Sequence, residues 1–396
     1  GEQIGQASLL NPQTTYGGDV IMRVKYCVEN GLDGPTGDIR KALNRMAAQC
    51  CAQAGQKMKD IYFITVVGNT CMHHLFLGIS PASLAYAPYT PAVAEPMQLL
   101  AAEYGFTVNP SAMLYMLPNI AGFVGADTVG ASLAASMDEK QRMTLLIDIG
   151  TNGEMVLGPR DRLVACSTAA GPAFEGALIS CGMRGAEGAI DHVSLADGKL
   201  SYSVIGGGKP IGICGSGLID IVAALFRTGI IDPKGKFHRE GRRIRRDEHG
   251  QGRYVIAFED ESGDGSEVSI NETDIDNFIR AKGAIFSATR AMLEGAGLTV
   301  DDLQHVMIAG GIGSGIDIPN AIRIGMLPKL PEEEYSYIGN SSLTGACAML
   351  ISDEAEQKVF DLGHNMTYLE LSTHPGYMEE FVAACFLPHT DASLFD

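Results

Sequence analysis

The sequence contains no tryptophan and few charged residues, which make up 19% of its 396 positions, against about a quarter in a typical globular protein. With 46% hydrophobic residues, the chain is too apolar to be intrinsically disordered. It also lacks a clean apolar run long enough to cross a bilayer, because the uncharged stretches 61–94 and 104–126 both contain Pro and Asn. We therefore predict no membrane-spanning segment, and the N-terminus carries no secretory signal.

Paired cysteine motifs are absent as well. The nine cysteines are scattered, and no two of them form a C-x-x-C pair. Local spacing therefore provides neither a zinc ribbon nor a ferredoxin-type cluster site. The interpretation that we favour is buried, reduced thiols in a cytoplasmic protein.

Positive charge is scarce, since 29 Lys and Arg stand against 47 Asp and Glu, giving a formal net charge of −18. Such a chain repels phosphate backbones and anionic lipids, so we expect no nucleic-acid and no membrane partner. A phosphate ligand would have to be held locally, by backbone N–H groups and a metal ion. Glycine, in contrast, is abundant, with 48 residues. The chain is longer than one hydrophobic core usually supports, so we expect two lobes.

Hydrophobic periodicity predicts alternating helices and strands, which is typical of mixed α/β lobes. Helices are expected at 19–29, 38–58, 72–77, 125–137, 215–228 and 274–294, and one more near Pro319. Strands are expected at 61–67, 113–116, 144–149, 154–157, 254–258 and 306–309. A basic run, 234–246, and an acidic run, 259–267, flank the strand at 254–258. We favour a solvated hairpin whose opposite charges face each other over a docking patch.

The first motif with chemical meaning is a buried strand that ends in a glycine turn, residues 145–154 (LLIDIGTNGE). Gly150 and Gly153 allow backbone N–H groups to approach phosphate oxygens closely, and Thr151 and Asn152 add neutral donors. The carboxylates at either end, Asp148 and Glu154, could hold Mg²⁺ directly or through water. The alternative is a plain glycine hairpin in which the Asp caps the turn.

Further glycine-rich loops follow strands or precede helices. Residues 306–314 (VMIAGGIGS) contain Gly310, Gly311, Gly313 and Ser314 between a strand and a helix, an arrangement that suits a nucleotide lying against bare backbone. A tight strand-to-helix turn is the alternative. The segments 169–176 (AAGPAFEG) and 213–220 (ICGSGLID), the second with Gly215 and Ser216, also lead into helices, whose N-termini attract anions.

Two more segments carry polar residues at the start of a helix. Asp127 opens a helix of small residues (GFVGADTVG, 122–130), where small side chains permit close packing of two helices. Asp127 could aim at a water or a metal ion, and an N-cap carboxylate is the equally supported alternative. His73 and His74 follow a Gly-Asn-Thr turn (VGNTCMHH, 67–74). Adjacent helical residues point about 100° apart, so we favour packing or supporting histidines over a shared metal ion.

In their order, these motifs resemble the ASKHA superfamily, which comprises acetate and sugar kinases, heat-shock chaperone ATPases and actin. More narrowly, the chain is similar to the ATP-dependent reductive activators of corrinoid proteins over nearly its whole length. That similarity lies in NPQ (11–13), YG (16–17), DVI (19–21), Arg23, VGNTCMHHLFLG, DIGTNGEM, AAGPAFEGA, GICGSGLID and IAGGIGSGID. The resemblance implies a two-lobed α/β fold with ribonuclease H-like lobes. A first lobe would span 1–143, a second 144–340, and a C-terminal helix and tail, 341–396, would return to the first.

The resemblance also implies ATP and Mg²⁺ as ligands and assigns roles to the motif residues. Phosphate and metal would be held by Asp148, Gly150, Thr151, Asn152, Gly153 and Glu154, with Asp148 and Glu154 as the metal ligands. The adenosine side would meet Gly310, Gly311, Gly313 and Ser314, and the cleft would be lined by Gly215 and Ser216. Asp127 would position the attacking water.

The implied reaction is the reduction of a corrinoid protein of a methyltransferase system from Co(II) to Co(I), with electrons from an N-terminal 2Fe–2S ferredoxin domain. That domain and the first phosphate hairpin, Asp-x-Gly-Thr-Thr, are expected upstream of residue 1. A small-molecule kinase with Asp127 as the base, and a non-catalytic nucleotide-gated binding module, are the alternatives. A dehydratase activator with a bound iron–sulfur cluster is disfavoured by the cysteine pattern. The oligomeric state stays open, a homodimer included.

Overall fold

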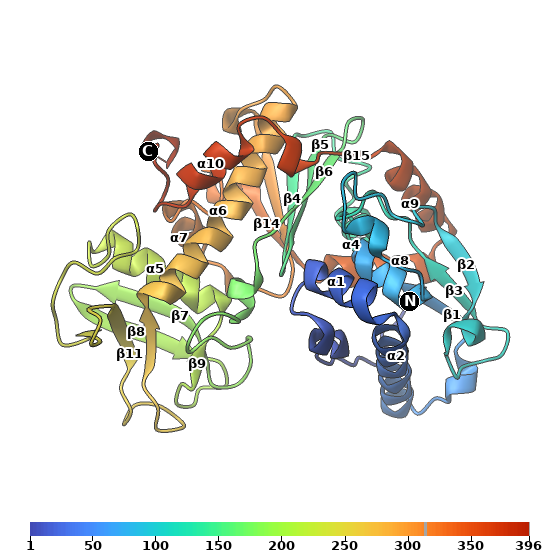
Figure 1. Ribbon diagram of the computed structural model, residues 1–396, viewed down its shortest axis with the longest axis horizontal. Coiled ribbons are helices and arrows are strands. Elements are labelled where there is room, and N and C mark those ends of the chain that lie inside the picture. Colours follow the sequence, from blue (N-terminus) through green and yellow to red (C-terminus); the bar gives the residue numbers. More distant parts are fainter. Residues whose placement is uncertain (313–314, 396) are drawn as a thin grey trace. The chain divides into compact units, whose positions relative to one another are not determined.

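The computed structural model describes residues 1–312 and 315–395 (Figure 1). The chain divides into two compact units. Unit 1 contains residues 1–141, 158–165 and 340–368, and unit 2 contains 142–157, 166–339 and the residues from Leu369 onward. The segment 341–396, which was expected to return to the first lobe as a whole, is therefore divided between the two units. Its last part joins unit 2 because α10 (Tyr377–Ala384) packs against α6 (Glu272–Gly295). In the described ranges, no helix has the length and apolar character needed to cross a membrane.

Unit 1 is built on a three-stranded sheet of order β1-β3-β2, in which β1 runs parallel and β2 antiparallel to β3. Its strands are β1 (Phe63–Val66), β2 (Met97–Leu100) and β3 (Met113–Met116). Its helices are α1 (Val20–Asn30), α2 (Asp33–Ala54), α3 (Thr70–Leu77), α4 (Ala126–Ala134), α8 (Ser341–Ile351) and α9 (Asp353–Asn365).

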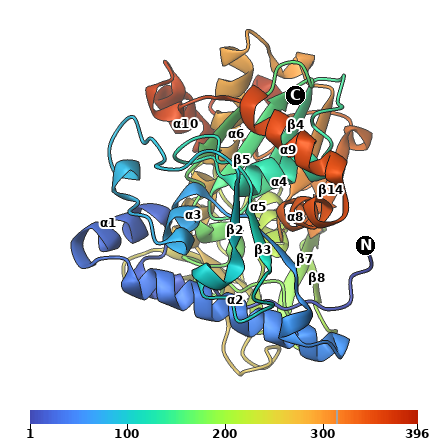
Figure 2. The same cartoon turned by 90° about the vertical axis from the view of Figure 1, so that its right-hand side faces the viewer.

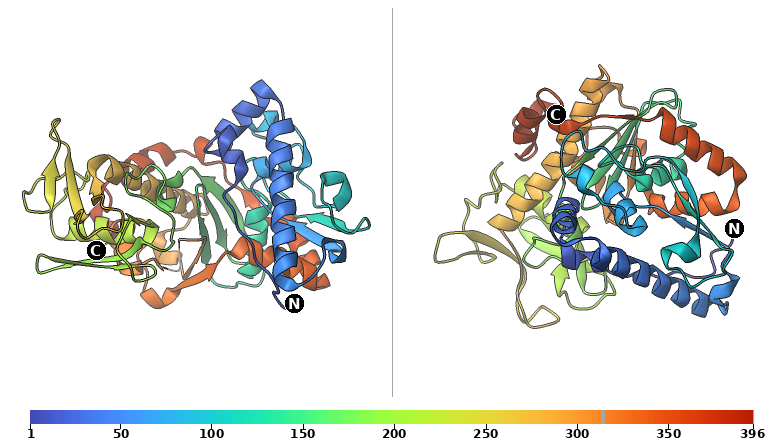
Figure 3. Two further views of the ribbon diagram at one scale, coloured as in Figure 1. Left: turned by 90° about the horizontal axis from the view of Figure 1, so that it is seen from below. Right: turned by 45° about the vertical axis from the view of Figure 1, so that its right-hand side comes forward.

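The long blue helix of Figure 3, α2, begins five residues before its predicted start at Asp38. Pro35 lies in the first turn of α2, where backbone N–H groups have no partner within the helix, so its missing N–H costs no hydrogen bond and the helix can begin before it. The helix ends at Ala54, where Gly55 adopts the left-handed conformation (φ 65°), and so it does not reach Met58 as predicted.

Two helices from distant parts of the sequence, α4 and α8, cross at glycines (Figure 2). A Cβ atom added to Gly345 would lie 2.0 Å from the Gly130 carbonyl oxygen, and one added to Gly130 would lie 3.0 Å from the Ser342 carbonyl oxygen. The close helix packing predicted from the small residues of 122–130 is therefore confirmed.

Unit 2 is centred on a sheet of order β14-β13-β4-β5-β6-β15. Its strands are β4 (Thr144–Ile149), β5 (Gly153–Gly158), β6 (Val164–Thr168), β13 (His305–Ala309), β14 (Tyr335–Gly339) and β15 (Thr367–Tyr368), and β15 and the first residues of β6 are counted with unit 1. One apolar face of α6 is buried, and the start of the helix is fixed by a capping box between Asn271 and Asp274.

Two smaller sheets complete unit 2, and the sequence pattern indicated only one of their strands. They have the orders β8-β7-β9 and β10-β11-β12. Their strands are β7 (Ala189–Ala196), β8 (Lys199–Val204), β9 (Gly212–Ile213), β10 (Ile244–Arg246), β11 (Gly252–Ala257) and β12 (Val268–Asn271), and the helices beside them are α5 (Gly215–Arg227) and α7 (Ile318–Arg323). Among the described residues, the predicted facing of the basic and acidic runs is seen for Arg245 and Glu267, which pair at 2.7 Å, and Glu267 also pairs at 3.0 Å with Arg253 of β11, outside the basic run.

Candidate functional site

The strands β4 and β13 bring two of the predicted glycine motifs together. They are parallel neighbours, and their register places Asp148 beside Ala309. Both chains turn at this edge of the sheet, β4 into the hairpin that starts at Gly150 and β13 into Gly310. A Cβ atom on Gly310 would lie 2.4 Å from the Ile149 carbonyl oxygen and 3.0 Å from Asp148 Oδ1. The carboxyl ends of parallel strands are where α/β sheets place their ligands.

The two glycines after β13 have different surroundings. Gly310 has a φ of 98°, and its N–H donates to the Gly339 carbonyl oxygen at 3.0 Å while its own carbonyl accepts from the Tyr337 hydroxyl. Among the described residues, nothing lies within 4 Å of a Cβ atom added to Gly311. Gly310 is therefore packed into the protein, whereas Gly311 presents bare backbone to open space. The other two predicted residues of this loop, Gly313 and Ser314, lie outside the described residues.

The hairpin turn between β4 and β5 is held by a neighbouring loop. The Gly150 N–H donates to the Asn152 carbonyl oxygen at 3.1 Å. The Thr151 hydroxyl donates to Glu175 Oε1 at 2.5 Å, and the Gly171 N–H donates to the Thr151 carbonyl oxygen at 2.8 Å. The Thr151 hydroxyl, expected as a phosphate donor, is thus engaged within the protein, which leaves backbone N–H groups for a ligand.

Glu175 is a residue that sequence reasoning missed. It ends the short 3-10 helix η5 (Pro172–Glu175), inside the segment 169–176 that the sequence marked as a glycine-framed loop. The one carboxylate in that loop was the available signal, but its contact with Thr151 depends on the tertiary fold. Gly171, with a φ of 75°, has nothing within 4 Å of an added Cβ atom. This second loop therefore also presents open backbone close to the hairpin.

The start of α5 packs against the same loops. A Cβ atom on Gly215 would lie 2.3 Å from the Phe174 carbonyl oxygen and 2.9 Å from Ile312 Cγ2, so only glycine fits there. The side chain of the N-cap, Cys214, accepts no capping hydrogen bond from the backbone N–H groups of the first turn. The Ser216 hydroxyl donates to the Asp191 carbonyl oxygen at 2.8 Å. Unit 2 thus gathers the loops at Gly150, Gly171, Gly215 and Gly311 around one edge of its sheet.

The two carboxylates predicted to bind a metal ion have different neighbours. Asp148 is half-buried beside Gly310. Burial, followed by the charge of Glu154, raises the pKa of the Cys166 thiol, so Glu154 lies close to β6. Within residues 1–312 and 315–395, no group of three or more His, Cys, Asp or Glu side chains could hold a metal ion by itself. Mg²⁺ keeps several waters and takes only one or two carboxylates, so Asp148 with nucleotide phosphates fits this ion.

The remaining predicted catalytic residue, Asp127, belongs to unit 1. It is the second residue of α4, whose N-cap is Gly125, so the N-cap interpretation of Asp127 is wrong. Its Oδ1 accepts from the Thr128 N–H at 2.9 Å, and its own N–H donates to the Gly68 carbonyl oxygen at 3.3 Å. A Cβ atom on Gly125 would lie 2.5 Å from Asn69 Cα. The Gly-Asn-Thr turn after β1 therefore packs directly on the start of this helix.

The adjacent histidines bind separate protein partners. His74 Nδ1 contacts the Thr70 carbonyl oxygen at 2.7 Å, and its Nε2 accepts from the Ala92 N–H at 2.9 Å. His73 Nδ1 contacts Asn119 Nδ2, and Asn119 Oδ1 accepts from the Ala126 N–H at 3.2 Å. Burial lowers the pKa of His73 to about 4. The packing interpretation of both histidines is confirmed.

A polar cavity of about 440 Å³ lies in unit 2 between β7, β8, α5 and α7. At its side, the buried Asp220 carboxylate accepts from Asn320 Nδ2 at 2.8 Å, from the Val193 N–H at 3.1 Å and from His192 Nδ1 at 3.2 Å. Burial raises the pKa of Asp220. The volume falls within the range of about 300–1,000 Å³ that is usual for ligand pockets. Its lining comes from four elements, so no sequence motif signalled it.

In comparisons with known proteins, two family models match consecutive parts of the chain, whereas unit 1 of the structure also includes 158–165 and 340–368. Residues 142–396 match the model of the C-terminal domain of RACo, the ASKHA domain, and residues 1–140 match the RACo middle region. The corrinoid activation enzyme RamQ of Eubacterium limosum is 37% identical over 96% of this chain and 65% of its own length. The Co(II) methylated amine-specific corrinoid protein reductase of Methanosarcina barkeri is 25% identical over 89% of this chain and 66% of its own length.

A solved structure, a reductive activator for corrinoid, iron-sulfur protein, superposes with a TM-score of 0.91 and 45% identity. The alignment covers 97% of this chain and 62% of that chain. This chain therefore spans slightly less than two thirds of the length of each of these relatives.

Proposed function

This chain belongs to the RACo family, with the middle region and the ASKHA domain of that family, and from this we propose that it is the ATP-binding and ATP-hydrolysing part of a corrinoid-protein activator. The ASKHA domain implies nucleotide binding. The observation that carries this proposal is the parallel register of β4 and β13, which places the Asp148 hairpin and the Gly310–Gly311 loop at one edge of the sheet. The relatives are named for corrinoid activation and reduction, and the proposed reaction is accordingly Co(II) to Co(I).

The phosphates would be received by the backbone N–H groups of Thr151, Asn152 and Gly153, while Gly150, whose own N–H donates to the Asn152 carbonyl oxygen, would let the phosphates approach the backbone closely. This is supported by the open space beside Gly150, where an added Cβ atom would meet only the Asn152 carbonyl oxygen, at 3.5 Å. Asp148 would hold Mg²⁺, directly or through water, and Glu154 is the second candidate ligand. When bound, this ion neutralises charge on the phosphates. Asp127 of unit 1 would orient the attacking water.

The nucleoside would leave the phosphate loops along the bare backbone of Gly311, past Gly215 and Ser216, towards α7. We place its base and ribose in the polar cavity lined by Asp220, Asn320 and His192, which α7 reaches directly after the glycine loop. Three donors hold the Asp220 carboxylate in place, so His192 and Asn320 are oriented before a ligand arrives.

The reduction would need one electron for each cobalt centre, supplied by a reduced 2Fe–2S domain that is not part of this sequence. Hydrolysis would drive a change of conformation that makes this transfer favourable. All nine cysteines are free thiols, which supports a cytoplasmic location.

Calorimetry with Mg·ATP, followed by phosphate release with and without Co(II) corrinoid iron–sulfur protein, tests the proposal. We expect nucleotide binding and hydrolysis that the corrinoid protein stimulates. Asp148→Asn should abolish the Mg²⁺ dependence of binding, whereas Asp161→Asn, at an exposed turn, should not. Absence of binding at millimolar nucleotide would contradict the proposal. Binding without phosphate release would favour the nucleotide-gated module, and phosphoryl transfer to an added small molecule would favour the kinase.

A further inference from the structure

The basic segment, residues 234–246, stands out against the charge of the rest of the chain. It contains seven Lys and Arg and one Glu, in a protein of net charge −18. Its arginines at 239, 242, 245 and 246 are all exposed. A local field of this sign, within a strongly negative molecule, is a feature that an electrostatic partner can recognise.

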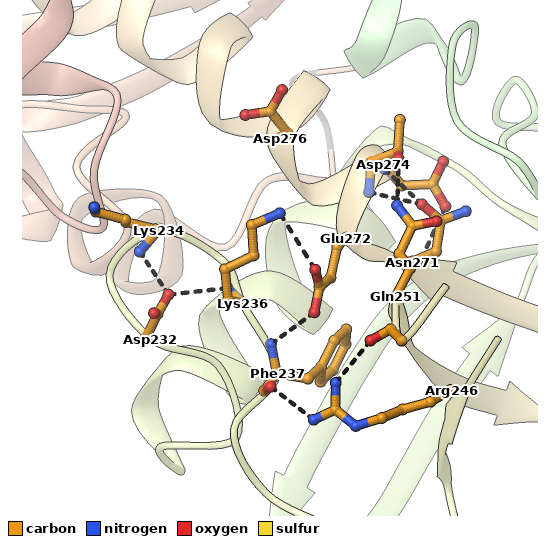
Figure 4. A network of polar contacts seen from close by, with 12 residues as sticks. Asp232, Lys234, Lys236, Phe237, Arg246, Gln251, Asn271, Glu272, Asp274 and Asp276 are labelled. Atoms are coloured by element: carbon orange, nitrogen blue, oxygen red, sulfur yellow. Dashed lines mark hydrogen bonds and ion pairs between the residues drawn. The ribbon is translucent and has the colours of Figure 1, made fainter. Parts of the chain in front are cut away.

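The fold holds this segment firmly against the start of α6 (Figure 4). Glu272 accepts from the Phe237 N–H at 3.2 Å and from Lys236 Nζ at 3.3 Å. Arg246 Nη2 donates to the Phe237 carbonyl oxygen at 2.9 Å, and Asp232 Oδ1 accepts from the N–H groups of Lys234 and Lys236. Both ends of the basic segment are therefore anchored by hydrogen bonds and an ion pair.

Three guanidinium groups of this segment gather on one aromatic ring. Arg243, Arg242 and Arg245 lie 4.8, 5.4 and 5.6 Å from the centroid of Phe258. All three charges therefore lie within roughly one Debye length of one another, about 10 Å at 0.1 M salt, and repel each other. Cation–π attraction offsets only about 0.5–1 kcal/mol for each exposed pair. We call Arg242, Arg243 and Arg245 the arginine cluster.

The acidic run that follows Phe258 leaves most of this charge uncompensated. Glu267 pairs with Arg245, but it is shared with Arg253. Glu261 accepts from the Phe258 N–H, and Asp264 accepts from the Ser266 N–H, so both carboxylates serve their own loop. Arg243 donates to the carbonyl oxygens of Val255 and Ile256. Among the described residues, the Arg242 side chain has neither an ion pair nor a hydrogen bond, and its electrostatic contact is the cation–π contact with the Phe258 ring.

We propose that the arginine cluster is the docking site for an acidic patch on the corrinoid protein, an inference that rests on the proposed function. Arg242 would supply the free guanidinium fork, which can bind a carboxylate through two N–H donors. A compact protein patch fits better than an extended polyanion, because a nucleic acid or an anionic membrane would also meet the negative remainder of the surface. The cluster would orient the encounter and raise its rate.

The test measures association of the protein with Co(II) corrinoid iron–sulfur protein by stopped flow, between low and high salt. Arg242→Glu should slow association about 3- to 10-fold at low salt, and the difference should vanish at high salt. Lys199→Glu, at the exposed first residue of β8, makes the same change of charge and should alter the rate less than twofold. Arg242→Lys should recover most of the rate. Unchanged association in Arg242→Glu, or an equal effect of Lys199→Glu, would overturn the proposal.

A second measurement separates this inference from the proposed function. Arg242→Glu should bind Mg·ATP as tightly as the unaltered protein does. If neither protein binds nucleotide, the ATPase proposal is refuted, while the association measurement still tests the docking site. If corrinoid iron–sulfur protein is not bound at all, an octaglutamate peptide decides. Binding that Arg242→Glu removes and Lys199→Glu retains supports the docking site, and no binding overturns it. Preference for a short DNA duplex over the peptide would also overturn it.

Discussion

Substitution of the two glycines after β13 should separate stability from nucleotide binding. In Gly310→Ala the new Cβ atom would lie 2.4 Å from the Ile149 carbonyl oxygen, and the residue would have to keep a φ of 98°. The left-handed backbone costs an alanine about 1–2 kcal/mol. The carbonyl cannot turn away without disturbing the pairing of β4 with β13, and overpacking of this kind costs about 1–3 kcal/mol more. We expect Gly310→Ala to lower the free energy of unfolding by about 2–4 kcal/mol.

Gly311→Ala is the matched control because the same atom is added one residue later. Its Cβ atom would meet nothing within 4 Å, and its φ lies outside the left-handed region, so the change in stability should stay within about 0.5 kcal/mol. If a nucleotide lies against this backbone, however, the methyl group would occupy ligand space. We expect the dissociation constant for Mg·ATP to rise roughly tenfold, which corresponds to about 1.4 kcal/mol.

Thermal unfolding and titration calorimetry on both variants check this pair of expectations. Native-like stability together with unaltered ATP affinity in Gly311→Ala would refute the idea that this backbone faces the ligand. Native-like stability in Gly310→Ala would refute the close contact between the ends of β4 and β13.

Three further predictions concern other parts of the molecule. Gly345→Ala should destabilise unit 1 by about 2 kcal/mol or more, because its Cβ atom would lie 2.0 Å from the Gly130 carbonyl oxygen. Its control, Gly37→Ala in the open part of α2, should raise the free energy of unfolding by up to about 1 kcal/mol. Urea titration distinguishes the two variants, and equal effects would contradict the crossing of α4 and α8. Burial lowers the pKa of Lys282 to about 7 from 10.5, so between these pH values the unfolded chain binds more protons than the folded one and stability rises with pH. Lys282→Met should reduce this rise by up to about 1.4 kcal/mol per pH unit in urea titrations at pH 7, 8 and 9. An unchanged slope would show that Lys282 is not the group responsible. Glu175→Gln should weaken the hydrogen bond from the Thr151 hydroxyl and thereby change the affinity for Mg·ATP. Glu294→Gln, on the exposed face of α6, should leave this affinity unchanged in the same calorimetric assay.

The sequence predicted the local elements of the site well. The strand at Thr144–Ile149 and the strand at Met113–Met116 have the predicted bounds, and α5 starts at the predicted Gly215. The ASKHA fold and the relation to corrinoid-protein activators, inferred from the joint set of motifs, are confirmed. The roles assigned to Asp127, Asp148 and the glycine loops stay predictions, which the variants above address.

Other features could not be predicted because they depend on contacts between distant segments. The N-cap of α4 is Gly125 and not Asp127, because the Gly-Asn-Thr turn packs on the start of the helix. The strands β7 and β8 do alternate buried and exposed residues, a pattern that our predictions missed, and the polar cavity beside them depends on their packing with α5 and α7. The acidic run 259–267 was expected to face the arginines; Glu267 does so, whereas Glu261 and Asp264 accept hydrogen bonds from N–H groups of their own loop.

The sequence by itself determined where strands end in glycine, where helices begin and which residue types stand at those junctions, because these are set by backbone freedom and by neighbours a few positions away. Only the tertiary structure decided which glycine is packed and which is open, and that Glu175 accepts the Thr151 hydroxyl hydrogen bond. It also decided that the Arg242 guanidinium meets no carboxylate among the described residues. Those outcomes follow from the parallel register of β4 with β13 and from the packing of loops against α5 and α6, which pair residues far apart in the chain.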